Sequence, residues 1–146
     1  MAAMILAYRR PFKNAILFPA AIQTSSIPLA THAETQFRKG CRQFAQGRFL
    51  PAIRCFIQVV DMEPKCAEAF HNLGLAYANL GNDDYAVQAL LKANEFYDQQ
   101  DSGDGVVRIL AQMEQLAGRR RDLSNRSVGS FSSQNVPSPN SPEARG

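Results

Sequence analysis

The sequence lacks every short pattern that would mark a familiar enzyme. Gly103 and Gly105 stand alone ahead of a predicted helix, where they fit a flexible connector and not a phosphate-binding loop. Asp83 and Asp84 are explained as residues at a helix N-terminus, so no paired-carboxylate signature is left. His71 has no serine, cysteine or carboxylate in a recognisable catalytic spacing. We therefore predict no catalytic residue, no enzymatic activity and no cofactor.

Metal and disulfide patterns are also lacking. Cys66 and His71 miss the i, i+4 spacing that places two ligands on one face of a helix, and no second pair exists. The cysteines are an odd set of three in a chain that can build a helical core, which argues against a disulfide framework. We interpret Cys41, Cys55 and Cys66 as small buried apolar side chains in a reducing compartment.

No apolar run reaches the length that a membrane-spanning helix needs, because Pro19 and Pro28 interrupt the one candidate stretch. A chain of 146 residues with 45% hydrophobic content suits one soluble domain. The formal charge of +3 is unevenly distributed: residues 34–118 hold eight basic and eleven acidic side chains, and the two flanking blocks are basic. Because the central block is acidic, nucleic acid is not a favoured partner.

Residues 1–32 contain basic, hydroxylated and apolar residues but no acid, which is the composition of a transit peptide. A secretory signal is the competing interpretation, with Thr31-His32-Ala33 as its cleavage site, although Pro19 interrupts the apolar part. A disordered N-terminus without a targeting role is the third. The predicted location is accordingly the cytoplasm, or a mitochondrion or plastid if the segment is a transit peptide.

Residues 119–146 begin with Arg119-Arg120-Arg121 and continue with serine and proline but few large apolar residues. Such a segment cannot bury enough surface to offset its ordering entropy, which predicts a disordered tail. Its candidate phosphosites are Ser124, three residues after an arginine, and Ser138 and Ser141, each before a proline.

The central segment repeats with a period of 34 residues, and such a period determines the architecture. Small residues superpose on small and large on large; the pairs are Ala33 and Ala67, Glu34 and Glu68, Gly40 and Gly74, Gly47 and Gly81, Ala52 and Ala86, Phe56 and Leu90, and Val59 and Ala93. Each copy has two apolar-periodic stretches separated by a glycine turn, which predicts a helical hairpin. Where the two helices cross, the glycines and alanines permit close contact.

The second copy resembles the tetratricopeptide repeat family almost place for place. The matching positions are Phe70, which stands for the usual tryptophan, Leu73, Gly74, Tyr77, Gly81, Ala86 and Ala93. The first copy keeps Gly40, Gly47, Ala52, Phe56 and Pro64 but has Gln36, Lys39 and Gln43 where large or apolar residues are usual. The resemblance covers residues 33–100 and implies an all-α solenoid of stacked antiparallel helix pairs, with repeats at 33–66 and 67–100.

A third copy would place Arg108 and Gln115 at the glycine positions, so no full repeat follows. We predict instead one capping helix at 104–117, which completes a helical domain over 33–118. Two repeats and a cap bury little surface, and this predicts self-association or stabilisation by a partner.

The family resemblance implies that the first helix of each hairpin lines a concave groove. The residues at those positions are Glu34, Phe37, Cys41, Phe44, Glu68, His71, Asn72, Leu75 and Asn79. One branch of the family grips the carboxylate of chaperone tails, with a lysine and an asparagine in the first repeat. Phe37 and Cys41 stand there instead, so that mode is not expected.

The sequence therefore predicts a protein–protein interaction module or adaptor that holds a peptide or helix of another protein in this groove. The alternative is a structural subunit of a larger helical assembly, with an RNA-associated accessory protein as a third reading. Charged substitutions at Phe37 and Leu75 are the sequence-based test that separates the first two.

Overall fold

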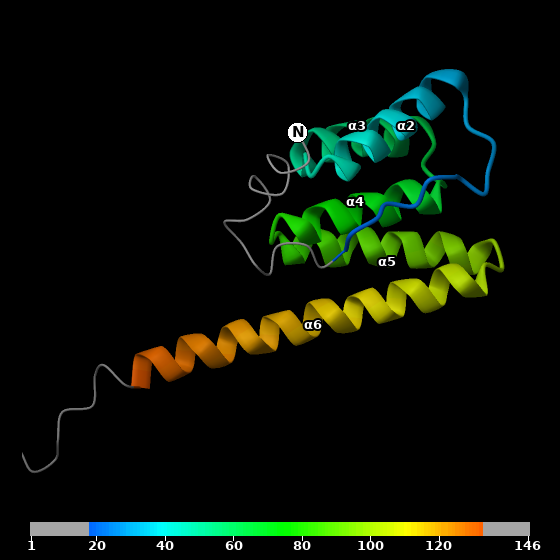
Figure 1. The fold of residues 1–146 in the computed structure, drawn as a ribbon. Coiled ribbons are helices and arrows are strands. Elements are labelled where there is room, and N and C mark those ends of the chain that lie inside the picture. Colours follow the sequence, from blue (N-terminus) through cyan, green and yellow to red (C-terminus); the bar gives the residue numbers. More distant parts are fainter. Residues whose placement is uncertain (1–17, 133–146) are drawn as a thin grey trace, which may run out of the picture. The chain divides into compact units, whose positions relative to one another are not determined.

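The computed structural model describes residues 18–132, and the helices among them form two hairpins followed by one longer helix (Figure 1). The helices are α2 (Thr31–Ala45), α3 (Phe49–Met62), α4 (Ala67–Asn79), α5 (Asp83–Gln99) and α6 (Gly103–Ser132). Helix α2 packs on α3, α4 packs on α5, and α3 and α2 both contact α4. No strand occurs between residues 18 and 132, which confirms the predicted all-α class.

The two hairpins turn in the same way. Gly47 and Gly81 end the first helix of each hairpin with φ of 73° and 82°, in the left-handed region that glycine occupies without strain. In both turns the residue after the glycine donates its N–H to the carbonyl five residues back, from Arg48 to Gln43 at 2.9 Å and from Asn82 to Tyr77 at 3.0 Å. The 34-residue period is therefore repeated in the backbone geometry.

Replacing Gly81 with alanine isolates this backbone requirement, because a methyl group there would meet no atom within 4 Å. We expect Gly81→Ala to lower the free energy of unfolding by about 1 kcal/mol, the cost of holding an L-residue at positive φ. Urea denaturation followed by circular dichroism measures the change. Gly81→Asn is the control, because asparagine tolerates this conformation better; equal losses for the two variants would contradict the turn assignment.

The period is also repeated in the packing. Four pairs of positions 34 residues apart are buried to 0% exposure: Ala33 and Ala67, Ala52 and Ala86, Phe56 and Leu90, and Val59 and Ala93. Of the remaining repeat positions, Leu73 is buried, Phe70 packs against Phe96 at 5.6 Å between ring centroids, and Tyr77 stacks on Tyr85 at 5.3 Å. Pro64 lies exposed in the connection between α3 and α4.

Glycine lets the two helices of each hairpin approach closely, as the sequence predicts, but its partners are larger than expected. A methyl group at Gly40 would lie 2.7 Å from the Phe56 ring, and one at Gly74 would lie 2.7 Å from Leu90 Cγ. Both partners are one helical turn beyond the alanines that the sequence suggested. Each crossing therefore seats a large side chain of the second helix against a glycine of the first.

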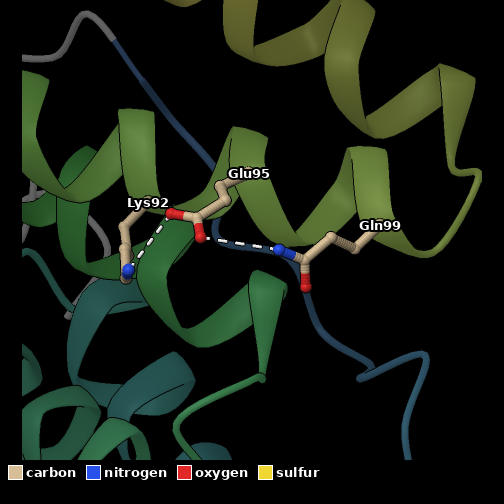
Figure 2. Close-up of polar contacts among 3 residues, drawn as sticks. All are labelled: Lys92, Glu95 and Gln99. Atoms are coloured by element: carbon tan, nitrogen blue, oxygen red, sulfur yellow. Dashed lines mark hydrogen bonds and ion pairs between the residues drawn. The ribbon is translucent and has the colours of Figure 1, made fainter.

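The polar outer face of α5 is solvated. Figure 2 shows Glu95 between Lys92 and Gln99, with an ion pair of 3.1 Å to Lys92 and a hydrogen bond of 3.5 Å from Gln99. Both members of the ion pair are about half exposed, so the pair contributes little stability. This surface explains why α5 is buried on one side only.

Helix α6 begins against the second hairpin. A methyl group at Gly105 would lie 2.5 Å from the Tyr97 ring, and Ile109 is fully buried, so the N-terminal part of α6 covers α5 as a capping helix should. Not every large apolar side chain of this part is covered, because Leu110 is 58% exposed. The division of the chain into two compact units falls after Met113.

The second unit, Glu114–Gly146, contains the rest of α6 among the described residues. The sequence predicted a helix end at 117 and a disordered tail from 119, whereas α6 continues to Ser132. The first proline of this region comes only at Pro137, so no proline interrupts the helix in residues 119–132, although the serines, Asn125 and Gly129 there are weaker helix formers than the arginines. Ser124 is exposed on α6; Ser138 and Ser141 lie outside the described residues.

The N-terminal region also differs from its prediction. Residues 1–17 lie outside the described part of the chain, but residues 18–26 form an extended segment beside α4 (Figure 1). Residues 27–30 connect this segment to α2, to which residues 31–32 already belong. The cleavage site considered for a secretory signal therefore falls in the first turn of α2, where Ala33 is buried. No helix between residues 18 and 132 is long and apolar enough to cross a membrane.

Candidate functional site

The extended segment 18–26 runs antiparallel to helix α4. Its backbone meets Asn79 near the end of α4 at Phe18, Asn72 in the middle at Ile22, and Glu68 near the start at Ser26. Positions 68, 72 and 79 share one face of a helix, because they are separated by four and seven residues. One stripe of polar side chains on α4 thus follows the segment along its length.

Asn72 holds the centre of the segment by both atoms of its amide group. Its Oδ1 accepts the Ile22 N–H at 2.6 Å, and its Nδ2 donates to the Ile22 carbonyl oxygen at 2.8 Å. An asparagine that binds the N–H and C=O of one residue in this way reads backbone and not side-chain identity. Asn72 is fully buried, so the pair of hydrogen bonds is shielded from water.

Cys41 of α2 adds a third contact to Ile22, because its Sγ donates to the same carbonyl oxygen at 3.4 Å. Burial raises the pKa of the Cys41 thiol to about 11, so the sulfur keeps its proton and remains a donor at neutral pH. Cys41, Cys55 and Cys66 are all buried and free of disulfides. Cys41 and Asn72 come from different hairpins, and the segment therefore bridges the two.

The two ends of the segment are held through main-chain groups as well. Asn79 Nδ2 donates to the Phe18 carbonyl at 3.0 Å, and the Ser26 N–H donates to Glu68 Oε1 at 3.0 Å. The Ser26 hydroxyl also donates to Gln100 Oε1 at 2.8 Å. We call Cys41, Glu68, Asn72 and Asn79 the docking residues.

Only two side chains of the segment are deeply buried. Phe18 is 4% exposed and Ala21 is 6% exposed, whereas the neighbours Pro19 and Ala20 are exposed. The two buried positions hold a large aromatic side chain and, three residues later, a small one. Ile22 and Ser25 are partly exposed, and the hydroxyl groups of Ser25 and Ser26 contact Cys66 Sγ and Gln100 Oε1.

Two buried acceptors of the docking residues remain unused. Glu68 Oε2 and Asn79 Oδ1 have no hydrogen-bond partner among the described residues, although Glu68 is only 5% and Asn79 only 8% exposed. Leaving a buried acceptor unpaired costs about 1–3 kcal/mol. The segment therefore leaves two hydrogen-bond acceptors of this surface without a donor.

A search against family models shows which kind of helix pair carries most of the docking residues. Residues 67–99, which form α4 and α5, match the model of the tetratricopeptide repeat. No curated protein and no solved structure matches the chain significantly. Repeats of this kind stack into solenoids whose surfaces generally bind proteins and are generally not enzymatic.

Four of the nine predicted groove residues, namely the docking residues, contact segment 18–26; three of them lie on α4, and Cys41 lies on α2. The others have different neighbours. Phe37 packs edge-on against Phe56 at 6.0 Å, Phe44 packs against Phe49 at 5.2 Å, and exposed Glu34 pairs with Arg38 at 2.8 Å. Leu75 is buried at 1% exposure. Charged residues at Phe37 or Leu75 would disrupt the core, so they cannot test binding.

His71 lies on the side of the repeat helix α4 that faces α5 and α6. Its Nε2 bonds Gln112 Oε1 at 2.5 Å, and its Nδ1 bonds the Tyr97 hydroxyl at 3.0 Å. Because an amide oxygen only accepts, Nε2 carries the proton, and Nδ1 accepts from Tyr97. Burial, the main cause, lowers the pKa of His71 to about 4; the Gln112 hydrogen bond opposes this effect, and nearby Arg108 adds to it.

The occupant of this surface, residues 18–26, is what sequence reasoning missed. Two features of the sequence could have indicated this segment. It is apolar and free of acidic residues while the central block is acidic, and Pro19 lies within it and Pro28 just after it. Proline and the residue before it favour extended backbone. No group of histidines, cysteines or carboxylates suited to a metal ion occurs among the described side chains.

Proposed function

We propose that this protein is an interaction module that binds an extended peptide of a partner protein on the α4 face of its tetratricopeptide repeat. The observation that carries the proposal is the double hydrogen bond from Asn72 to the backbone of Ile22. A surface that holds one extended strand by its main chain is suited to hold another of similar shape.

The arrangement favours an extended peptide over a helix. A helix satisfies its own backbone groups, so it has no free N–H and C=O pair on one residue to offer Asn72. Phe18 and Ala21 fill the buried positions, which indicates that affinity comes from one large and one small apolar side chain together with backbone hydrogen bonds. The predicted alternative of a structural subunit does not account for a fully buried asparagine aimed at a peptide backbone.

The test is a peptide-display selection on the full chain, followed by affinity measurement on Asn72→Asp. This substitution keeps the size of the side chain but replaces the Nδ2 donor with an acceptor that faces the peptide carbonyl. We expect selected peptides to lose affinity by at least about tenfold, the effect of one lost hydrogen bond and one repulsive contact.

Asn82→Asp is the matched control, because Asn82 is exposed at the turn before α5 and its replacement changes the charge by the same amount. Circular dichroism verifies that both variants keep their helix content. Selected peptides that bind Asn72→Asp as tightly as the unaltered chain would exclude the proposed surface.

A further inference from the structure

The surface proposed for a partner is occupied by the chain itself. Both amide atoms of Asn72 are used by Ile22, and Cys41 and Glu68 also donate to or accept from the segment backbone. A second peptide cannot form the same hydrogen bonds at the same time. Resting on the proposed function, we infer that residues 18–26 are a built-in competitor, which a partner peptide must displace before it binds.

The short connection to α2 makes the competitor effective. Residues 27–30 join the segment to the start of α2 at Thr31, and the Ala30 N–H contacts Glu63 at 3.3 Å. A segment tethered by so few residues has an effective concentration on the order of millimolar at its own site. The apparent affinity of a partner is reduced by the fraction of molecules in which the site is open.

The segment is nevertheless built to be displaced. It carries no charged side chain between residues 18 and 30, and it buries only Phe18 and Ala21 deeply. It also leaves Glu68 Oε2 and Asn79 Oδ1 unpaired among the described residues. A partner that matches the two apolar positions and adds an N–H or ammonium donor opposite Glu68 would make a contact that the segment lacks.

The two buried positions and the unpaired oxygen of Glu68 define the chemistry of the partner. It is an extended peptide that runs antiparallel to α4, with a large apolar residue in the position of Phe18 and a small uncharged one in the position of Ala21. A basic residue near the position of Ser26 would meet the spare carboxylate oxygen of Glu68. The acidic charge of the central block favours such a peptide over an acidic one.

Two single substitutions in the full chain allow the site to be compared with the segment released and with the segment bound. Ala21→Asp places a carboxylate in a position that is 6% exposed, whereas Ala20→Asp adds the same charge one residue earlier, where the side chain is exposed. The docking residues are unaltered in both. We expect Ala21→Asp to release the segment and Ala20→Asp to leave it bound.

Release is measured without any partner. In the unaltered chain and in Ala20→Asp, the Ile22 amide is expected to exchange slowly with deuterium and Cys41 to resist alkylation. In Ala21→Asp both should react at least about tenfold faster, while Cys55, which is buried on α3 and forms no hydrogen bond with residues 18–26, serves as the internal reference.

The binding probe is a labelled synthetic peptide with the sequence of residues 18–28, followed by fluorescence anisotropy. We expect it to bind Ala21→Asp on the order of tenfold more tightly than it binds the unaltered chain or Ala20→Asp. Combining Ala21→Asp with Asn72→Asp should abolish this gain. A peptide variant with lysine in place of Ser26 should bind more tightly than the parent peptide.

Three results would count against these ideas, and they differ. If Ala21→Asp releases the segment but the peptide binds all variants equally, the competitor is excluded and the proposed function stands. If the peptide and the display-selected peptides bind no variant, the proposed function fails as well. If protection of Ile22 rises with protein concentration together with a dimer in light scattering, the segment docks between copies and the tethered competitor is excluded.

Discussion

Gly74→Ala is expected to destabilise the protein by on the order of 1–3 kcal/mol, although alanine is the better helix former. The added methyl group would lie 2.7 Å from Leu90 Cγ and 3.2 Å from the Ala86 carbonyl oxygen, closer than a carbon side chain packs. Leu90 is fully buried and has little room to move, and the carbonyl belongs to the backbone of α5. Thermal and urea denaturation measure the loss.

A double-mutant cycle of Gly74 and Leu90 tests whether the clash between them causes this loss of stability. Leu90→Ala alone should cost about 2–5 kcal/mol through the cavity that it leaves. Adding Gly74→Ala to it should cost much less than in the unaltered chain, because the clashing side chain is gone. Gly103→Ala is the control, since a methyl group there would meet nothing within 4 Å. Strictly additive losses at Gly74 and Leu90 would contradict the close approach.

The crossing at Gly74 illustrates what could be predicted from the sequence and why. A 34-residue period with glycine and alanine at fixed places predicts two helix pairs in close contact, and the pairs α2–α3 and α4–α5 are present. The period does not reveal which atoms fill the crossing. That depends on side-chain volume one turn further along, where Phe56 and Leu90 stand.

The docking residues were only partly predictable. Family resemblance placed Cys41, Glu68, Asn72 and Asn79 on the lining, but the same rule placed His71, Phe37 and Phe44 there too. Neighbouring positions of a helix face different sides, so a residue adjacent to a lining position points into the core or toward the next helix. His71 and Asn72 are consecutive, and they face α6 and the segment respectively.

The segment itself could not be predicted, because its docking depends on contacts between residues about 50 positions apart, such as Ile22 with Asn72. Composition reports whether a segment can fold by itself, and residues 18–30 have no repeated apolar pattern of their own. They are held by hydrogen-bonding groups of other elements, chiefly α4 together with Cys41 of α2. The extension of α6 was missed for a different reason: the serine-rich composition of residues 119–132 predicted a disordered tail, but no proline interrupts the helix there.

Acidification should destabilise the protein through His71. The pKa of this imidazole is about 4 in the folded protein against an ordinary 6.5, mainly because burial disfavours the charged ring. The unfolded chain therefore binds more protons between these two values, so the stability that His71 contributes is fully present above pH 6.5 and is lost as pH falls toward 4. Between pH 7 and 4.5 the loss should be on the order of 2–3 kcal/mol.

The experiment compares unfolding free energies at pH 7 and 4.5 in the unaltered chain and in His71→Gln. Glutamine can donate to Gln112 and accept from Tyr97, the two partners of His71, but it does not titrate. Carboxylates titrate in both proteins, so subtracting one pH profile from the other isolates the histidine. His32, the other histidine of the chain, is exposed, and His32→Gln should retain the full pH dependence.

The same pH series tests whether the packing of the capping helix α6 and the docking of segment 18–26 are lost together. Protonated His71 would lose its acceptor nitrogen toward Tyr97, whose ring packs against Gly105 in the first turn of α6, whereas Asn72 on the neighbouring face does not titrate. At pH values where the chain is still folded, we therefore expect Ile22 to stay protected while amides of the first turns of α6 exchange faster. If the Ile22 amide lost its protection at a higher pH than the amides of α6, the docking surface, and not the His71 contact, would be the acid-sensitive part of the molecule.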